Sequence, residues 1–137
     1  MIGLLILAQR DFGKGLLCSA EHVLGELPPG VEALPVDYEL SQDRLGEIMA
    51  ERLKTLDDGD GVLILADIYG ASHTNTACRL LRKKRIELVS GVNLPMLIRV
   101  LNYRGLGLEE LVAKALSGGP EGIVSAPATL DRTEISR

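Results

Sequence analysis

Two short segments of the chain are continuously apolar, with no alternation of polar residues. They are Ile2–Leu7 and Val62–Ala66. Strands of this kind are usually covered on both faces, which is typical of a parallel sheet between layers of helices. The pattern predicts a shorter strand at Val31–Val36, where Pro35 favours the sheet edge because it cannot donate a main-chain hydrogen bond. A fourth strand is predicted at Ile86–Ser90.

Between these strands, apolar residues recur at the three- and four-residue spacing of amphipathic helices. The first helical pattern stops at Gly25, and the second follows Ser41, a favourable N-cap residue. A third helix is predicted over about Ser72–Arg82. Asn93 and Pro95 are typical of the start of a fourth. Alternating strands and helices predict an α/β fold that is doubly wound, with a mostly parallel sheet and helices on both faces.

The C-terminal part gives weaker signals. The last helical pattern begins at Leu108, and Gly118–Gly119 is expected to close it. Gly122–Ser125 is a candidate for a final short strand. Residues 127–137 are polar and are expected to form a loose tail, so that the domain would cover residues 1–126.

Composition narrows the classes of function. The 137 residues suit one domain, and a net charge of −4 gives no basic excess to bind nucleic acid. The N-terminal apolar run is too short to span a bilayer and lacks a basic leader, so we expect a cytoplasmic protein without direct membrane insertion. Cys18 and Cys78 lie far apart and show no metal-ligand spacing, so neither a metal nor a cofactor is expected.

Three loops are candidates for a ligand site, because ligands of doubly wound sheets bind beyond the carboxyl ends of the strands. They are Ala8–Gly15, Asp67–Asn75 and Gly91–Pro95. The second places a carboxylate at a strand end, then Gly70, then Ser72 at a helix start. The free N–H groups and positive pole of that helix favour phosphate or another anion. The same arrangement also occurs as plain helix capping.

Several segments together resemble the mannose-type IIA family of the bacterial sugar phosphotransferase system. They are I-G-L-L-I-L, G-L-L-C-S-A-E-H-V-L-G, the D-I-Y-G-A-S loop with Asn75, and S-G-V-N-L-P-M-L-I-R-V-L. The resemblance runs from Ile2 to about Ile123 and is nearest to short single-domain, fructose-subfamily IIA components. It implies an open α/β sheet and a phosphohistidine passed from HPr to a IIB component. It also implies a homodimer in which a C-terminal strand is exchanged between subunits.

The resemblance assigns residues to a phosphate pocket. Asp67 matches the family aspartate that lies beside the phosphohistidine. The phosphate-loop positions are matched by Gly70, Ala71 and Ser72. The histidine position holds Gln9, and Arg10 follows in place of glycine. A carboxamide nitrogen is delocalised into its carbonyl and is a very poor nucleophile, although Gln9 can still hydrogen-bond Asp67 and keep the shape of the pocket.

His73 stands where the resemblance expects proline, in the first turn of the third helix. A helix N-terminus disfavours a protonated imidazole, so a neutral nucleophile there is chemically reasonable. His73 is therefore a candidate substitute phosphoacceptor, with a solvent-facing or capping role as the alternative. Arg10 either pairs with Asp67, binds an anion or is simply solvated. Tyr69 is a candidate for the surface that docks partner proteins.

Three functions follow as hypotheses. The first is a degenerate IIA component that binds HPr, a IIB component or a regulatory partner without carrying phosphate at Gln9. The second is an active phosphoryl carrier that uses His73. The third is an anion-binding or small-molecule-binding module, supported by the Asp67–Asn75 loop, whose helix start favours anions.

Overall fold

Four parallel strands form one sheet in the order β2-β1-β3-β4. The strands are β1 (Gly3–Gln9), β2 (Val31–Val36), β3 (Val62–Ala66) and β4 (Ile86–Ser90). The computed structural model describes residues 1–37, 39–69, 71–81 and 85–133. The strand that contains Pro35 lies at an edge of the sheet, as the sequence predicts.

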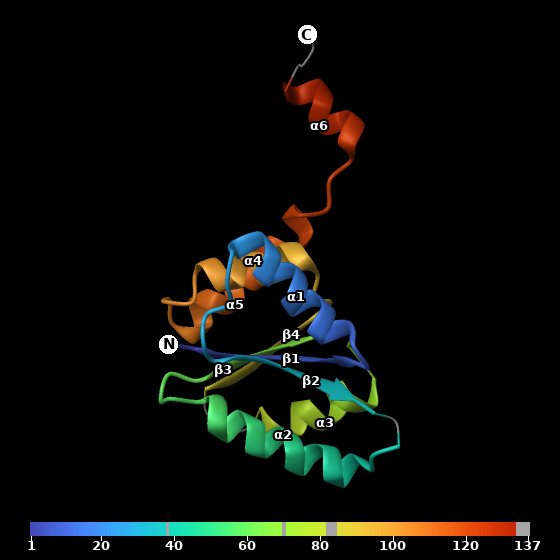
Figure 1. Ribbon diagram of the computed structural model, residues 1–137, viewed down its shortest axis with the longest axis vertical. Helices are drawn as coiled ribbons and strands as arrows, with labels where there is room; N and C mark the ends of the chain where they lie inside the picture. Colours follow the sequence, from blue (N-terminus) through green and yellow to red (C-terminus); the bar gives the residue numbers. More distant parts are fainter. Residues whose placement is uncertain (38, 70, 82–84, 134–137) are drawn as a thin grey trace.

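Helices cover both faces of the sheet (Figure 1). They are α1 (Phe12–Leu24), α2 (Gln42–Leu56), α3 (Ser72–Leu80), α4 (Leu94–Asn102), α5 (Leu108–Glu121) and α6 (Ala126–Thr133). Helices α1, α4 and α5 lie on one face, and α2 and α3 lie on the other (Figure 1). The predicted doubly wound α/β fold, with a parallel sheet between two helical layers, is confirmed.

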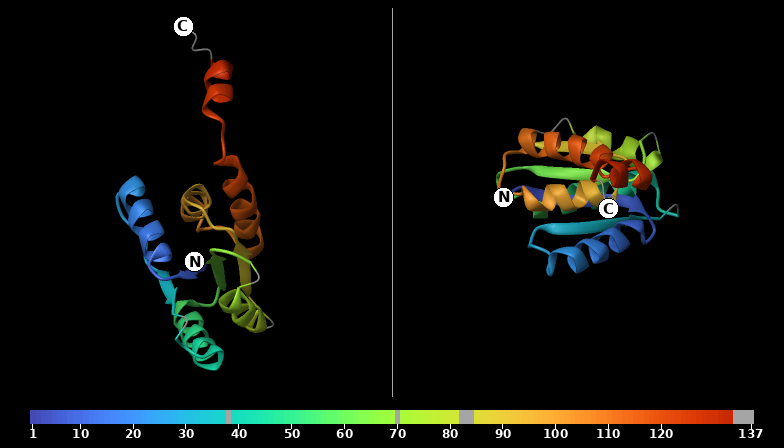
Figure 2. Two further views of the ribbon diagram at one scale, coloured as in Figure 1. Left: turned by 90° about the vertical axis from the view of Figure 1, so that its right-hand side faces the viewer. Right: turned by 90° about the horizontal axis from the view of Figure 1, so that it is seen from above.

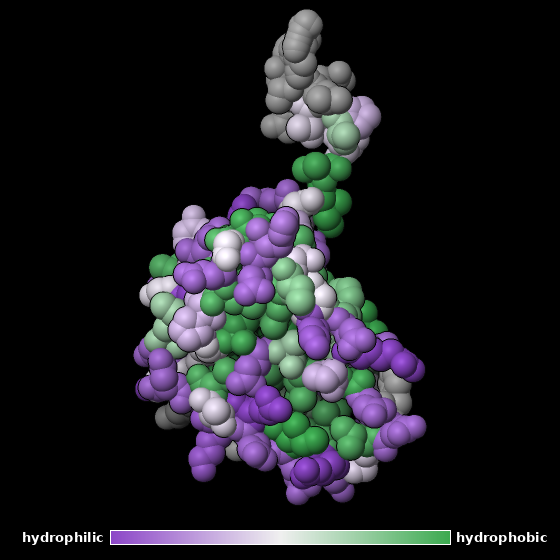
Figure 3. All heavy atoms as spheres, in the orientation of Figure 1, coloured by the Kyte–Doolittle hydropathy of each residue, from purple (hydrophilic) through white to green (hydrophobic). Residues whose placement is uncertain are grey.

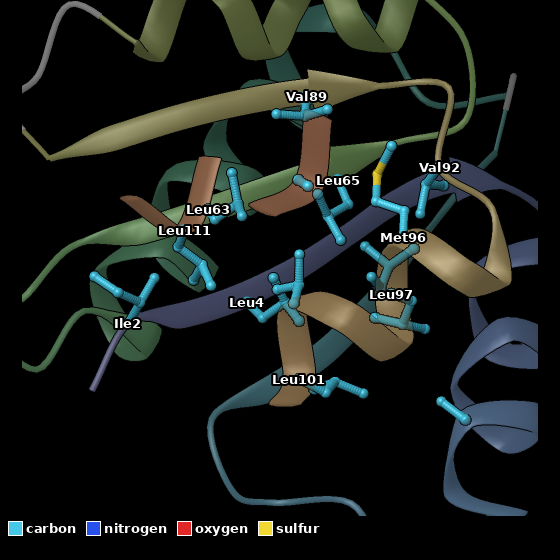
Figure 4. Packing of buried hydrophobic residues seen from close by; sticks show 14 of the residues in the cluster. Ile2, Leu4, Leu63, Leu65, Val89, Val92, Met96, Leu97, Leu101 and Leu111 are labelled. Atoms are coloured by element: carbon cyan, nitrogen blue, oxygen red, sulfur yellow. The ribbon is translucent and has the colours of Figure 1, made fainter. Parts of the chain in front are cut away.

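The central strand β1 is buried on both faces, which explains its unbroken apolar sequence. Leu4 and Ile6 pack with α1, α4 and α5, whereas Leu5 and Leu7 pack with α2 and α3. Figure 4 shows the first of these clusters, where side chains from the sheet meet those of α4 and α5. Each fully buried leucine or isoleucine contributes about 1.5–3 kcal/mol relative to an exposed one. This packing fixes the strand ends on which the candidate site depends.

Three helix ends are set by the residues that the sequence marks. The Ser41 hydroxyl accepts a hydrogen bond from the Arg44 N–H at 3.1 Å and caps α2. The Asn93 side chain accepts one from the Met96 N–H at 2.9 Å and caps α4. Gly25 ends α1 with φ at 95°, a left-handed conformation in which glycine meets no steric penalty.

The end of α5 differs from the prediction. Gly118 and Gly119 do not close the helix, which continues to Glu121. Both glycines are buried against α4, where an added Cβ would lie 3.0 Å from the Arg99 Cβ and 3.0 Å from the Met96 Cε, respectively. The two glycines therefore allow α5 to lie close to α4, and helix packing overrides their usual role as stop signals.

The C-terminal segment forms a helix, not the expected tail, in the single subunit. Gly122–Ser125 forms no strand among the described residues, and the segment from Ala126 to Thr133 forms α6 rather than a loose tail. Figures 1 and 2 show this helix projecting away from the rest of the domain. The neck before it exposes Ile123 (76%) and Val124 (67%), and Figure 3 shows hydrophobic surface there. The two apolar side chains of this neck are thus exposed to solvent in a single subunit.

Candidate functional site

The loops after β1 and β3 meet at the carboxyl ends of the strands. The chain passes from β1 to β2 on one side and then places β3 on the other side of β1, so the connections diverge between β1 and β3. Ligands of such sheets bind at this point. The Asp67 N–H donates to the Leu7 carbonyl at 3.2 Å, and the Val92 N–H donates to the Ala66 carbonyl at 3.0 Å. The three loops selected from the sequence therefore gather at one edge.

Asp67 is the centre of this arrangement. Its Oδ2 accepts a hydrogen bond from the main-chain N–H of Gln9 at 3.0 Å. Its Oδ1 accepts one from the N–H of Ile68 at 2.8 Å and lies 2.6 Å from Nε2 of His73. One carboxylate thus joins the end of β1, the loop after β3 and the start of α3. Gln9 does contact Asp67, but through its main chain rather than through its amide.

The contacts of Asp67 determine its charge. Burial alone would raise the pKa of this carboxyl group. Hydrogen bonds from His73 and from the N–H groups of Gln9 and Ile68 outweigh burial and hold the pKa below its ordinary value of 3.8. Asp67 is therefore ionised at neutral pH, and its side chain is only 13% exposed. The loops thus meet around a partly buried negative charge.

His73 does not face solvent, so that interpretation of the sequence is wrong. Its side chain is fully buried, with 0% exposure, in the first turn of α3. An ionised carboxylate accepts but cannot donate, so Nε2 carries the hydrogen that is shared with Asp67. Within the described part of the chain, the buried Nδ1 atom has no hydrogen-bond partner. One ring nitrogen of His73 thus donates to Asp67, and the other is buried without a hydrogen-bond partner among the described residues.

Arg10 lies directly beyond the end of β1 and adopts a left-handed backbone conformation, with φ at 48°. Glycine adopts this conformation without strain, which gives a physical reason for the glycine that the resemblance expects here. The Arg10 N–H donates to the Val36 carbonyl at 3.3 Å, and its side chain is exposed. Among the described residues no ion pair joins Arg10 to Asp67, so the structure does not contain the pairing that the sequence offered as one alternative.

The start of α3 has no side-chain cap. Ala71 occupies the N-cap position without a side-chain cap, and Ser72 is exposed at the first helical position. The first N–H groups of a helix have no partner within it, so those of α3 are available to an anionic group. Gly70, the third predicted member of this loop, lies outside the described residues.

The described residues also bear on metal binding, on the state of the cysteines and on membrane spanning. Within residues 1–37, 39–69, 71–81 and 85–133, no three histidine, cysteine or carboxylate side chains converge as a metal site. Cys18 and Cys78 are free. No helix in the same described ranges is long and apolar enough to cross a bilayer.

Comparison with known proteins identifies the family. The family model described as the PTS system fructose IIA component matches residues 3–116. The chain belongs to this family. It is 36% identical over 118 residues to the PTS system mannose-specific EIIAB component of Escherichia coli K12. That match covers 82% of this chain but 36% of the relative, so the chain spans about a third of the relative's length.

Two other relatives match over most of their own length. The PTS system fructose-specific EIIA component of Bacillus subtilis is 32% identical over 121 residues, covering 85% of this chain and 82% of that protein. The crystal structure of phosphotransferase system component EIIA from Streptococcus agalactiae superposes with a TM-score of 0.83 at 26% identity. It covers 93% of this chain and 99% of that one. These matches support a IIA domain over nearly all of the chain.

The sequence predicted that Gln9 lies beside Asp67, but neither the main-chain route of that contact nor the contact of His73 with the same carboxylate. The signal for the His73 contact was its place in the first helical turn after a strand-end aspartate. That spacing brings the imidazole near the carboxylate only if α3 presents it to the sheet. The rotation of α3 depends on its packing against α2, which the local sequence does not specify.

Proposed function

We propose that this chain is a phosphotransferase-system IIA protein that binds HPr, a IIB component or a regulatory partner but carries no phosphoryl group at position 9. The observation that carries the proposal is the pairing of Gln9 with Asp67. The residue at the end of β1 lies next to the carboxylate, as a phosphoacceptor would, yet its side chain is an amide. An amide nitrogen has no localised lone pair with which to attack phosphorus.

The alternative of a carrier that uses another histidine has little support. The chain contains two histidines, His22 and His73. His22 is exposed on α1, roughly 15 Å along the helix axis from Phe12 at 1.5 Å per residue. His73 is enclosed, and its Nε2 is occupied by Asp67. A reacting nitrogen must come within about 3–3.5 Å of the phosphorus, which the burial of His73 opposes.

A partner-docking role is supported by the surface around the loops. Tyr69 is 74% exposed and Ile68 is 51% exposed in the loop after β3, and Phe12 is 49% exposed at the start of α1. Large apolar side chains that stay exposed next to a pocket are typical of interaction sites. This surface would face HPr or a IIB component in the cytoplasm, where the proposal requires the protein to act.

A homodimer is part of the same proposal. Ile123 and Val124 are exposed in the neck that leads to α6. Burial of these two side chains by a second subunit would remove apolar surface from water. In sedimentation equilibrium we expect a dimer for the wild-type protein. Ile123→Asp combined with Val124→Asp should give a monomer, and a monomeric wild-type protein would contradict this part of the proposal.

The decisive experiment measures phosphorylation directly. The wild-type protein is incubated with phosphoenolpyruvate, enzyme I and HPr, and is then analysed by intact mass spectrometry. Phosphorylated HPr in the same sample is the positive control for the donor. We expect no phosphoryl adduct on the chain. An acid-labile adduct that disappears in His73→Ala would instead establish the carrier that uses His73.

Binding is tested separately by calorimetry against HPr and the IIB component. Tyr69→Ala should weaken binding, because it removes an exposed aromatic side chain next to the pocket. Tyr103→Ala is the matched control, since Tyr103 is 43% exposed at the far end of α4. If neither HPr nor the IIB component binds but inorganic phosphate does, the anion-binding alternative takes the place of this proposal.

A further inference from the structure

The contact between His73 and Asp67 connects two elements that approach the pocket from different directions. The carboxylate belongs to the loop after β3, and the imidazole belongs to the first turn of α3. Their atoms lie 2.6 Å apart, a short distance for a nitrogen donor and a charged oxygen. His73 is fully buried and the Asp67 side chain is 13% exposed, so the contact is largely shielded from solvent. The contact is therefore a firm constraint on the direction of the carboxylate.

Position 9 depends on the same carboxylate. The main-chain N–H of Gln9 donates to Oδ2 of Asp67, so any side chain at this position starts from a residue already bound to Asp67. An ionised carboxylate offers about four lone-pair sites. Three donors occupy it here, namely the N–H groups of Gln9 and Ile68 and the ring of His73. One site on Oδ2 stays open, so a new donor at position 9 would share the negative charge of this carboxylate with His73.

We propose that His73 is a positioning residue that holds the Asp67 carboxylate and draws on the negative charge that a side chain at position 9 would also use. The inference rests on the proposed function and adds a second obstacle to phosphoryl transfer. Replacement of Gln9 by histidine would then restore the nucleophile without restoring the full rate. Release of the carboxylate from His73 would raise the rate further, because more of its negative charge would act on the new imidazole.

The chemistry explains why the carboxylate matters. In the transfer, a nitrogen–phosphorus bond in phosphorylated HPr breaks and a nitrogen–phosphorus bond to the new imidazole forms. The attacking ring nitrogen must be unprotonated, and the second ring nitrogen keeps its hydrogen throughout. A carboxylate that accepts this hydrogen fixes the tautomer and stabilises positive charge on the ring. A carboxylate already shared among three donors does this less well.

The experiment compares three variants in the same phosphorylation assay. Gln9→His alone supplies the nucleophile. Gln9→His with His73→Leu removes the competing donor but keeps an apolar side chain in the buried site. Gln9→His with His73→Gln is the matched control, because the glutamine Nε2 can donate to Asp67 as the imidazole Nε2 does. His73→Ala is run in parallel with His73→Leu, so that the test does not depend on one variant folding.

We expect the leucine or alanine double variant to accept the phosphoryl group about tenfold faster than Gln9→His, the worth of one hydrogen bond to a charged group. The glutamine double variant should be as slow as Gln9→His. The proposal is wrong if release of His73 gives no faster transfer, or if the glutamine variant is as fast as the leucine variant. An adduct on the wild-type chain would refute the proposed function instead, so the two failures are distinguishable.

A second measurement separates positioning from a purely structural role. The carboxyl carbon of Asp67 is followed by NMR as the pH is lowered. Loss of the His73 hydrogen bond should raise the pKa of Asp67, because burial remains while one stabilising donor is gone. His73→Gln should keep this pKa low. An unchanged pKa in His73→Leu would overturn the proposal.

Discussion

Replacement of Asp67 by asparagine tests the central feature of the site. Asparagine keeps one acceptor oxygen but replaces the other with an NH2 group. This NH2 group would face an N–H donor, and that donor would then have no acceptor. The three hydrogen bonds measure 2.6–3.0 Å, and the side chain is 13% exposed. A hydrogen bond to a charged group contributes about 1.5–3 kcal/mol, and an unsatisfied buried donor adds a similar cost. We expect Asp67→Asn to lower the free energy of unfolding by about 2–4 kcal/mol.

The pH dependence of this loss has a defined sign. The pKa of Asp67 is lower in the folded protein than its ordinary value of 3.8, so the folded state binds fewer protons than the unfolded state. Its stabilising contribution is therefore present above pH 3.8 and is lost as the pH falls through the lower folded value. Urea unfolding of wild type and Asp67→Asn between pH 7 and pH 3 should show the difference between them shrink below about pH 4.

A control and a refuting result complete the test. Asp11→Asn removes an exposed carboxylate near the same loop that makes no capping hydrogen bond, and it should change stability by less than about 0.5 kcal/mol. The reasoning fails if Asp67→Asn costs as little as this control. It also fails if the difference between wild type and Asp67→Asn stays constant across the pH range.

Four further substitutions can be measured by the same urea unfolding. Asn93→Ala should cost about 1–2 kcal/mol, because it removes the cap of α4. Gly122→Ala should cost about 1–3 kcal/mol, since its Cβ would lie 2.2 Å from the Pro95 Cβ. Gly15→Ala, with nothing within 4 Å of the added Cβ, should instead stabilise α1 by about 0.5–1 kcal/mol. Arg10→Gly should raise the free energy of unfolding by about 0.5–1 kcal/mol, because glycine adopts the left-handed conformation at position 10 without strain. A lower free energy of unfolding would show that Arg10 is not strained.

Much of the fold could be predicted because burial leaves a direct mark on the sequence. Val62–Ala66 is apolar at every position and is buried at every position. Pro35 marks an edge strand because an inner strand needs the hydrogen bond that proline lacks. Ser41 and Asn93 mark helix starts because their side chains satisfy local N–H groups. In each case the cause acts within a few residues of the chain.

The errors arose where distant residues decide the outcome. Gly118 and Gly119 look like a helix end, yet α4 packs against them and the helix continues. His73 looks exposed from its place in a first helical turn, yet the packing of α3 buries it. Local patterns cannot specify contacts of this kind.

Gln9 and His73 both contact the same carboxylate, that of Asp67. A buried carboxylate is costly unless donors surround it, and Gln9 offers Asp67 no imidazole. His73 supplies a donor from the opposite side of the pocket and keeps the ionised carboxylate stable. We therefore expect substitutions at positions 9 and 73 to have non-additive effects, because both residues act through a single carboxylate.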